Sequence, residues 1–308
     1  MDVIFLGTPQ FAVPTLRALV EARHHVLAVY TQPDRPKGRG RATPFSPVKE
    51  AALELGLEVR QPDRIRRPEV VAEIAALHPA VAVVVGYGQI IPQAIIDIPR
   101  HGIVNVHASL LPKYRGAAPI QWAIARGETR TGITTMRIDA GLDTGAMLLK
   151  WETGIAPEET AVELGERLSR HGAGLLIETL HGLEAGAITP EPQDNRQATF
   201  APILKKEDGL IDWNLPARDI LNRMRGFTPW PGAYTFFRSR RFHIWKARET
   251  SADDPGVLRV RGRQAVAGCG NGTGIELIEV QLEGRKRMPA QAFLNGNPID
   301  QQEVLTNC

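Results

Sequence analysis

Three polar side chains in the first half of the chain have the types and spacing for acid–base chemistry. The segment NVHASLLPKYRGAAPIQ places Asn105 and His107 two residues apart, in an otherwise apolar β-rich run. Side chains alternate along a strand, so these two polar groups share one face. Burying them without partners costs free energy, so they need internal hydrogen bonds or a ligand. At the end of a strand we favour a ligand over a hydrogen-bonded pair that merely closes a loop.

A third polar group follows in the stretch MRIDAGLDTGA. Gly141 and Gly145 permit a tight turn, with Asp143 at its apex and Asp139 just before it. Either aspartate alone is explained more simply as a turn cap. An Asn, a His and an Asp at adjacent strand ends, however, can stabilise a carbonyl oxygen as it becomes an oxyanion. The same set can move a proton between an amine nucleophile and its leaving group.

Several common catalytic motifs do not occur. The first turn, FLGTPQF, lacks G-x-G-x-x-G, and the chain has no Walker loop, no H-E-x-x-H and no G-x-S-x-G. These absences argue against a nicotinamide, nucleoside-triphosphate or zinc enzyme, and we expect no metal. They favour direct acyl transfer without a covalent enzyme intermediate.

Two cysteines, Cys269 and Cys308, fit a reducing compartment.

Residues 1–186 alternate β-rich and amphipathic segments, which predicts a doubly wound, mostly parallel α/β sheet. Strands are expected at Val3–Gly7, Val26–Thr31, Ala80–Gly86, Ile103–His107, Gly132–Asp139 and Ala146–Trp151. Helices are expected at Phe11–Arg23, Ser46–Leu55, Pro68–Leu77, Ala118–Arg126 and Pro157–Leu183, the last with a break near Gly172. Ligands of such sheets bind at the carboxyl ends of the strands, where Asn105 and His107 lie.

The second half of the chain has a different pattern. A stretch rich in Pro, Gln and Asn predicts a linker at 189–205 between a domain at 1–188 and another at 206–308. One helix, Ala217–Phe227, then precedes short strands, which indicates a small β-barrel or sandwich. The strands are expected at Ala233–Arg238, Arg241–Glu249, Gly256–Arg261, Gln264–Cys269 and Gly274–Gln281.

Positive charge is concentrated in two places. From Lys205 onward the chain has 16 Lys and Arg against 12 Asp and Glu, and the segment TQPDRPKGRGRATPFSPVKE is also basic. A solvated surface is the simpler explanation of the composition, but a polyanionic partner would also use such residues.

No stretch approaches the ~20 apolar residues of a membrane span, and the first residues do not resemble a secretion signal. We therefore expect a cytoplasmic protein that binds no membrane.

These motifs together resemble the formyltetrahydrofolate-dependent formyltransferases. NVHASLLPKYRGAAP is similar to the family's signature, GLDTG to its aspartate turn, and TQPDRPKGRG to an insertion of its tRNA-acting members. The resemblance runs nearly end to end and includes KKEDGLIDW and FTPWPGAY. It implies a Rossmann-like donor domain followed by a C-terminal barrel of the oligonucleotide-binding type.

The resemblance also implies roles for particular residues. Asn105, His107 and Asp143 would be catalytic. The residues implied at the folate site are Gly86, Tyr87, Gly88, Gln89, Ile90, Ser109, Leu110, Leu111, Pro112 and Asp139. The residues implied to contact tRNA are Arg35, Lys37, Arg39, Arg41, Lys205 and Lys206.

The implied activity is formyl transfer from 10-formyltetrahydrofolate to the amino group of methionine on initiator methionyl-tRNA. We expect the protein to be a monomer. Alternatives remain open within and outside the family. A formyltransferase for nucleotide-linked amino sugars would not need the basic loop, and neither a formyl-folate hydrolase nor a glycinamide-ribonucleotide enzyme would need the barrel. A non-catalytic RNA-binding protein would not need Asn105, His107 and Asp143.

Overall fold

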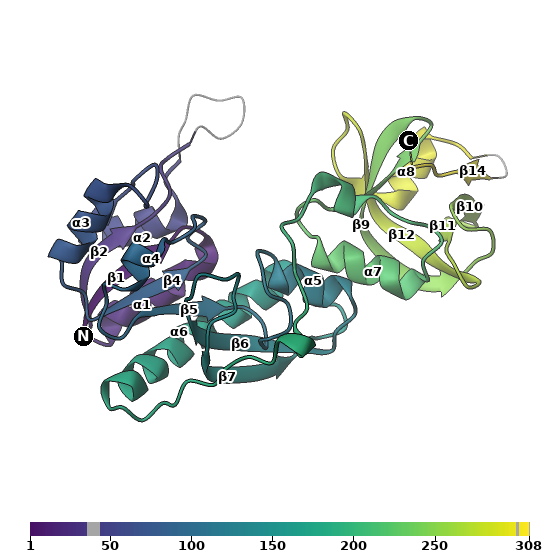
Figure 1. The fold of residues 1–308 in the computed structure, drawn as a ribbon. Helices are drawn as coiled ribbons and strands as arrows, with labels where there is room; N and C mark the ends of the chain where they lie inside the picture. Colours follow the sequence, from purple (N-terminus) through teal and green to yellow (C-terminus); the bar gives the residue numbers. More distant parts are fainter. Residues whose placement is uncertain (36–43, 300–301, 308) are drawn as a thin grey trace. The chain divides into compact units, whose positions relative to one another are not determined.

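The protein is described by a computed structural model that covers residues 1–35, 44–299 and 302–307 (Figure 1). Its contacts group into two compact units. The first comprises Met1–Pro119, Arg130–Thr153 and Gly165–Pro202, and the second comprises Ile120–Thr129, Gly154–Leu164 and Ile203–Cys308. Among the described helices, none is long and apolar enough to cross a membrane.

The first unit is built on a seven-stranded sheet with the order β3-β2-β1-β4-β5-β6-β7. Its strands are β1 (Asp2–Gly7), β2 (His25–Tyr30), β3 (Val59–Arg60), β4 (Val81–Val85), β5 (Ile103–His107), β6 (Arg130–Arg137) and β7 (Met147–Gly154). Strands β1 to β5 pair in parallel, whereas β6 runs antiparallel to β5. Buried apolar residues fill the parallel strands, as expected for strands covered on both faces.

In the described residues, the connections of this unit contain five α-helices and two 3₁₀ turns. The α-helices are α1 (Val13–Glu21), α2 (Pro47–Glu54), α3 (Pro68–Ala76), α4 (Gln93–Ile96) and α6 (Ala161–Glu184), and the 3₁₀ turns are η1 (Gln10–Ala12) and η2 (Asn195–Gln197). Local chemistry explains how α2 begins. The Ser46 hydroxyl accepts a hydrogen bond from the Lys49 N–H at 3.1 Å, and Pro47 occupies the first turn, where no N–H is needed.

The predicted break near Gly172 is wrong, because α6 continues through it. A Cβ atom at this position would lie 3.0 Å from Cγ1 of Val106 on β5. Gly172 therefore lets the helix pack closely on the sheet beneath it. The glycine reflects a packing requirement rather than a helix end.

The second unit is an antiparallel sheet in the order β14-β10-β11-β12-β9-β8, with β13 paired to β12. Its strands are β8 (Ala233–Phe237), β9 (Arg240–Ser251), β10 (Val257–Arg261), β11 (Gln264–Gly268), β12 (Thr273–Leu282), β13 (Met288–Pro289) and β14 (Glu303–Val304). At one edge, Val304 pairs with Val257 of β10. Two residues later, Thr306 pairs with Phe236 of β8, at the other edge. The last residues thus close the sheet on itself, and the structure confirms the predicted α/β domain and small C-terminal barrel.

The part of the chain that the structure describes has four further helices, which belong to the second unit or precede its barrel: α5 (Pro119–Ala125), η3 (Lys206–Gly209), α7 (Ala217–Gly226) and α8 (Ala290–Gly296). Helix α7 places Ile220 and Met224 in the barrel core. Phe293 of α8 contacts Phe242 in the same core, with ring centroids 4.7 Å apart. Helix α8 was not predicted from the sequence, because its pattern, AQAFLNG, is short.

Candidate functional site

Strand β5 places both predicted polar residues in the interior of the first unit. Asn105 is 9% exposed and lies between Val84 of β4 and Met136 of β6. His107, two residues later, is 5% exposed. The side-chain amide of Asn105 makes no hydrogen bond to the described residues. Its nitrogen and oxygen are also not among the fully buried side-chain atoms that lack a hydrogen-bond partner. Its N–H groups are therefore available to a ligand.

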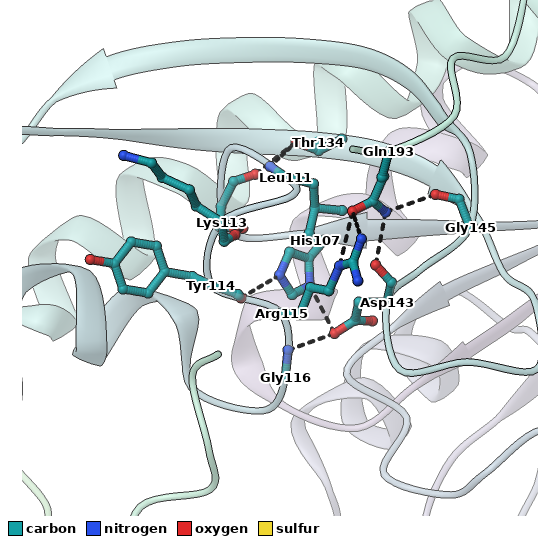
Figure 2. Close-up of polar contacts among 11 residues, drawn as sticks. His107, Leu111, Lys113, Tyr114, Arg115, Gly116, Thr134, Asp143, Gly145 and Gln193 are labelled. Atoms are coloured by element: carbon teal, nitrogen blue, oxygen red, sulfur yellow. Dashed lines mark hydrogen bonds and ion pairs between the residues drawn. The ribbon is translucent and has the colours of Figure 1, made fainter. Parts of the chain in front are cut away.

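The surroundings of His107 fix which ring nitrogen carries a proton (Figure 2). Nε2 lies 2.9 Å from the backbone carbonyl of Tyr114, which can only accept a hydrogen bond. Nε2 is therefore protonated, and the neutral ring has its free lone pair on Nδ1. Nδ1 lies 3.7 Å from Oδ2 of Asp143. A proton taken up at Nδ1 would be stabilised by this carboxylate.

The turn between β6 and β7 positions Asp143. Its backbone is left-handed, with φ of +51°, a conformation that Asp tolerates better than most residues. Oδ2 accepts a hydrogen bond of 2.7 Å from the Gly116 N–H. This bond directs the carboxylate toward the His107 ring. Of the predicted catalytic residues, His107 and Asp143 thus meet directly, and Asn105 lies on the same strand and face.

The loop after β5 is braced by its own polar groups. Ser109 Oγ donates to the Lys113 carbonyl at 2.6 Å. Thr134 on β6 donates to the Ser109 carbonyl at 2.7 Å and accepts from the Leu111 N–H at 3.1 Å. Leu111 is buried with Met136, as part of a small apolar cluster. Ser109, Leu110, Leu111 and Pro112 lie directly after β5, where they shape the loop beside His107.

The second predicted donor-binding segment follows β4. Gly86 and Gly88 both have positive φ, of +59° and +85°, and Tyr87 between them is buried. The Tyr87 carbonyl accepts from Oγ1 of Thr8 at 3.0 Å and from Nε2 of Gln32 at 3.1 Å, at the ends of β1 and β2. Burial raises the pKa of the Tyr87 phenol, whose oxygen has no hydrogen-bond partner among the described residues.

Of the other predicted donor-site residues, two have side chains that are hydrogen-bonded within the protein and one has an exposed side chain. The side-chain amide of Gln89 accepts a hydrogen bond from the Ile65 N–H at 2.7 Å and donates one to the Pro62 carbonyl at 3.1 Å. Both ends of this amide are therefore bonded within the protein. Ile90 is 92% exposed. Oδ1 of Asp139 accepts from the Gly141 N–H and the Thr144 hydroxyl, as a turn cap does.

Two residues near the site were not predicted from the sequence. Arg115 is 4% exposed, and Gln193, from the segment predicted as a linker, bonds to it. Gln193 also donates to the backbone carbonyl of Asp143. Arg115 lies inside the quoted signature and could have been noticed as a charge in an apolar stretch. Gln193 lies 50 residues from Asp143 in an aperiodic stretch, and no local signal identifies it.

Only part of the predicted tRNA-contacting set can be located. Lys37, Arg39 and Arg41 lie outside the described residues. Arg35 is exposed, as are Lys205 and Lys206 at the start of η3. Beside Arg35, the Asp34 carboxylate forms an ion pair with Lys49 of α2 and accepts a 2.9 Å hydrogen bond from Gln61. These contacts join two positions of the basic segment, Asp34 near its start and Lys49 near its end.

Replacing Asp34 with Asn is expected to weaken the fold in a pH-dependent way. The hydrogen bonds from Lys49 and then Gln61 lower the pKa of Asp34, so its stabilisation is present above the unfolded-state pKa of about 3.9. It is lost as the pH falls through the lower folded-state value. We expect a loss of up to ~1 kcal/mol in the free energy of unfolding at neutral pH. Urea titrations of wild type and variant should differ above the unfolded-state pKa of Asp34 and converge as the pH falls through its lower folded-state pKa. A difference that does not change with pH would contradict this prediction, and the exposed Asp63→Asn serves as the control.

Comparison with known proteins identifies relatives of the whole chain. Residues 1–180 match the family described as formyl transferase, and residues 203–298 match the formyl transferase C-terminal domain. A methionyl-tRNA formyltransferase of Solibacter usitatus is 60% identical over 308 residues, which cover 99% of this chain and 98% of the relative. The methionyl-tRNA formyltransferase of Geobacter metallireducens is 52% identical over 298 residues, which cover 96% of each.

Solved structures share the fold at lower identity. WlaRD, a sugar 3N-formyl transferase solved in the presence of dTDP and 5-N-formyl-THF, is 17% identical with a TM-score of 0.67, covering 93% of this chain and 99% of that one. HypX from Aquifex aeolicus, solved with tetrahydrofolic acid, is 17% identical with a TM-score of 0.61. The match covers 99% of this chain and 50% of HypX.

Proposed function

The chain belongs to the formyl transferase family, and on this premise we propose that it formylates the α-amino group of methionine on initiator methionyl-tRNA. The donor is 10-formyltetrahydrofolate. One observation of the site supports this proposal most directly: the available Asn105 amide shares a strand face with the His107 ring, which faces Asp143 at 3.7 Å. This arrangement supplies a hydrogen-bond donor and a proton carrier without a nucleophile, as direct transfer to an amine requires.

In the proposed reaction, the methionine nitrogen forms a bond to the formyl carbon. Asn105 donates a hydrogen bond to the formyl oxygen, which becomes an oxyanion. The bond from that carbon to the folate nitrogen then breaks as the carbonyl re-forms. The attacking amine loses one proton and the folate nitrogen gains one. His107 takes up the proton at Nδ1, where Asp143 stabilises the imidazolium, and passes it on toward the leaving nitrogen.

In this proposal, each of the two predicted domains has its own role. Residues 1–188 would bind the donor and perform the transfer, and residues 206–308 would bind tRNA after a linker at 189–205. The folate-contacting set comprises Gly86, Tyr87, Gly88, Gln89, Ile90, Ser109, Leu110, Leu111, Pro112 and Asp139. For Gln89 and Asp139, whose side chains already have protein partners, we propose contact through the backbone. We further propose a cytoplasmic monomer that needs no metal.

An assay with competing acceptors tests this function. The purified protein and 10-formyltetrahydrofolate are incubated separately with initiator methionyl-tRNA, elongator methionyl-tRNA and a nucleotide-linked amino sugar. We expect formylation of the initiator tRNA, with little or none on the other two. Formylation of the sugar instead would reassign the acceptor, and no product from any amine would refute the transfer.

Changing Arg39 to Ala should weaken use of the tRNA without impairing the chemistry. Arg39 is proposed to contact the acceptor arm of the tRNA. Further contacts with the tRNA are proposed for Arg35, Lys37, Arg41, Lys205 and Lys206. Losing one cationic contact with phosphate should raise the KM for tRNA and flatten its dependence on salt. Steady-state kinetics at several salt concentrations measure both effects, with Arg66→Ala, an exposed arginine of the same unit, as the control. An unchanged KM for tRNA would argue against this role.

A further inference from the structure

A hydrogen-bonded pair, Arg115 and Gln193, supports the turn that carries Asp143 (Figure 2). Nε2 of Gln193 donates to the backbone carbonyls of Asp143 and Gly145, both at 2.8 Å. Oε1 of the same amide accepts from Nε of Arg115 at 3.0 Å and from Nη2 at 2.8 Å. One side chain thus joins a buried guanidinium to the turn on both sides of Thr144.

Chemistry alone determines the orientation of this amide. A guanidinium can only donate hydrogen bonds and a backbone carbonyl can only accept them. The Gln193 oxygen must therefore face Arg115, and its NH₂ group must face the turn. The opposite orientation would oppose donors to donors and acceptors to acceptors. Gln193 uses both amide hydrogens and its oxygen, so it has a single favourable position.

Arg115 is itself firmly held. It is 4% exposed, and no carboxylate of the described residues lies within ion-pair distance of it. Its remaining side-chain bond goes from Nη2 to Oδ1 of Asn195 at 2.8 Å. Its backbone N–H donates to the Thr199 carbonyl at 2.9 Å, and its carbonyl accepts from the Ala201 N–H at 2.7 Å. Hydrogen bonds from a charged donor are stronger than neutral ones, so Arg115 is a rigid support for Gln193.

Asp143 is consequently held at both its backbone and its carboxylate. Gln193 binds its carbonyl, and the N–H of Gly116, next to Arg115, binds Oδ2. We propose that Gln193 is a positioning residue, which with Arg115 keeps the Asp143 carboxylate in place to stabilise a protonated His107. Its kinetic consequence rests on the function proposed above. The segment predicted as a linker therefore completes the catalytic site.

The size of the effect follows from the geometry. A misplacement of about 1 Å in a catalytic group can reduce the rate by ~10²-fold. Without the two Gln193 bonds, the turn keeps the Gly116 contact but loses the bonds that fix its backbone on either side of Thr144. The loss should affect the chemical step, because Gln193 supports a group that acts on the proton rather than one that holds the substrates.

Two substitutions separate positioning from general stability. Gln193→Glu keeps the size of the side chain and still accepts from Arg115, but it cannot donate to the two carbonyls. Gln193→Ala removes both sets of bonds. Gln197→Ala is the matched control, since Gln197 is exposed on the same segment and its side chain donates only to Asp194. Two readouts are measured: kcat and KM for both substrates, and the hydrogen-exchange rate of the Gly116 amide by NMR.

For both Gln193 variants we expect kcat to fall by about 10- to 100-fold, with each KM changing less than about threefold. We expect the Gly116 amide, whose acceptor is the Asp143 carboxylate, to exchange at least ~10-fold faster. The Gln197 variant should match wild type in both readouts. An unchanged kcat, or an unchanged Gly116 exchange rate in Gln193→Glu, would overturn the proposal. If wild type itself formylates no amine, the proposed function fails, while the exchange rates still decide whether Gln193 positions Asp143.

Discussion

Replacing Asn105, His107 or Asp143 with Ala should reduce formyl transfer by about 10²–10³-fold for each residue. The Asn105 amide on β5 is a hydrogen-bond donor without a protein partner among the described residues. Loss of a single donor to an oxyanion typically lowers the rate by about 10²–10³-fold. His107 and Asp143, at 3.7 Å, form the proton carrier, so either loss interrupts proton transfer. Single-turnover formylation at saturating donor and methionyl-tRNA measures the chemical step. Near-normal rates in all three variants would refute the assignment.

A more conservative substitution, Asp143→Asn, removes the charge of this side chain while keeping its shape. Asp143 has a left-handed backbone, which Asn, like Asp, adopts more readily than Ala. Asp143→Asn also retains an oxygen that can accept from the Gly116 N–H. We therefore expect its thermal unfolding to stay close to that of wild type while its rate falls as in the Ala variant. A rate near that of wild type would mean that the carboxylate charge is not required.

Substitution of Gly116 by Ala should damage both the fold and the activity. Gly116 has φ of +118°, and a Cβ atom there would lie 2.6 Å from the backbone carbonyl oxygen of Ala201. Either the 199–201 segment or the Gly116 backbone must shift, and that backbone carries the N–H that binds Asp143. We expect a loss of about 1–3 kcal/mol in the free energy of unfolding. Turnover of the folded fraction should fall by ~10²-fold.

Gly102→Ala is the control for this experiment. Gly102 also has a positive φ, of +72°, but nothing lies within 4 Å of the position of its missing Cβ atom. It therefore reports the conformational cost of Ala alone, about 1 kcal/mol, without the clash. Denaturant titration and single-turnover rates of both variants should show a larger stability loss and a rate defect only for Gly116→Ala. Equal effects in the two variants would contradict the steric argument.

The sequence was most informative where physical rules act locally. Alternation along Ile103–His107 predicted that Asn105 and His107 share a face, and both lie on β5, which ends at His107. That a ligand binds at this strand end stays a prediction. Glycines around Asp143 predicted the turn. The predicted helix break at Gly172 is wrong, because a glycine that permits close packing on Val106 has the same appearance in sequence as one that ends a helix.

Features that depend on distant contacts were not predictable in this way. Gln193 has polar neighbours and no periodicity, and only the folded chain shows that it contacts Asp143. Closure of the barrel depends on Thr306 meeting Phe236, a pairing between residues 70 positions apart that no turn signal specifies. The antiparallel pairing of β5 with β6 is likewise a property of the whole sheet.

The most direct test of direct formyl transfer is a rapid-quench experiment with enzyme in excess over donor labelled in its formyl group. Enzyme and labelled 10-formyltetrahydrofolate are mixed with initiator methionyl-tRNA, and label is followed on folate, protein and methionine. We expect the label to pass from folate to the methionine nitrogen in one kinetic phase, with none on the protein. Label that appears on the protein before it reaches methionine, or that never reaches methionine, would contradict direct attack assisted by Asn105, His107 and Asp143.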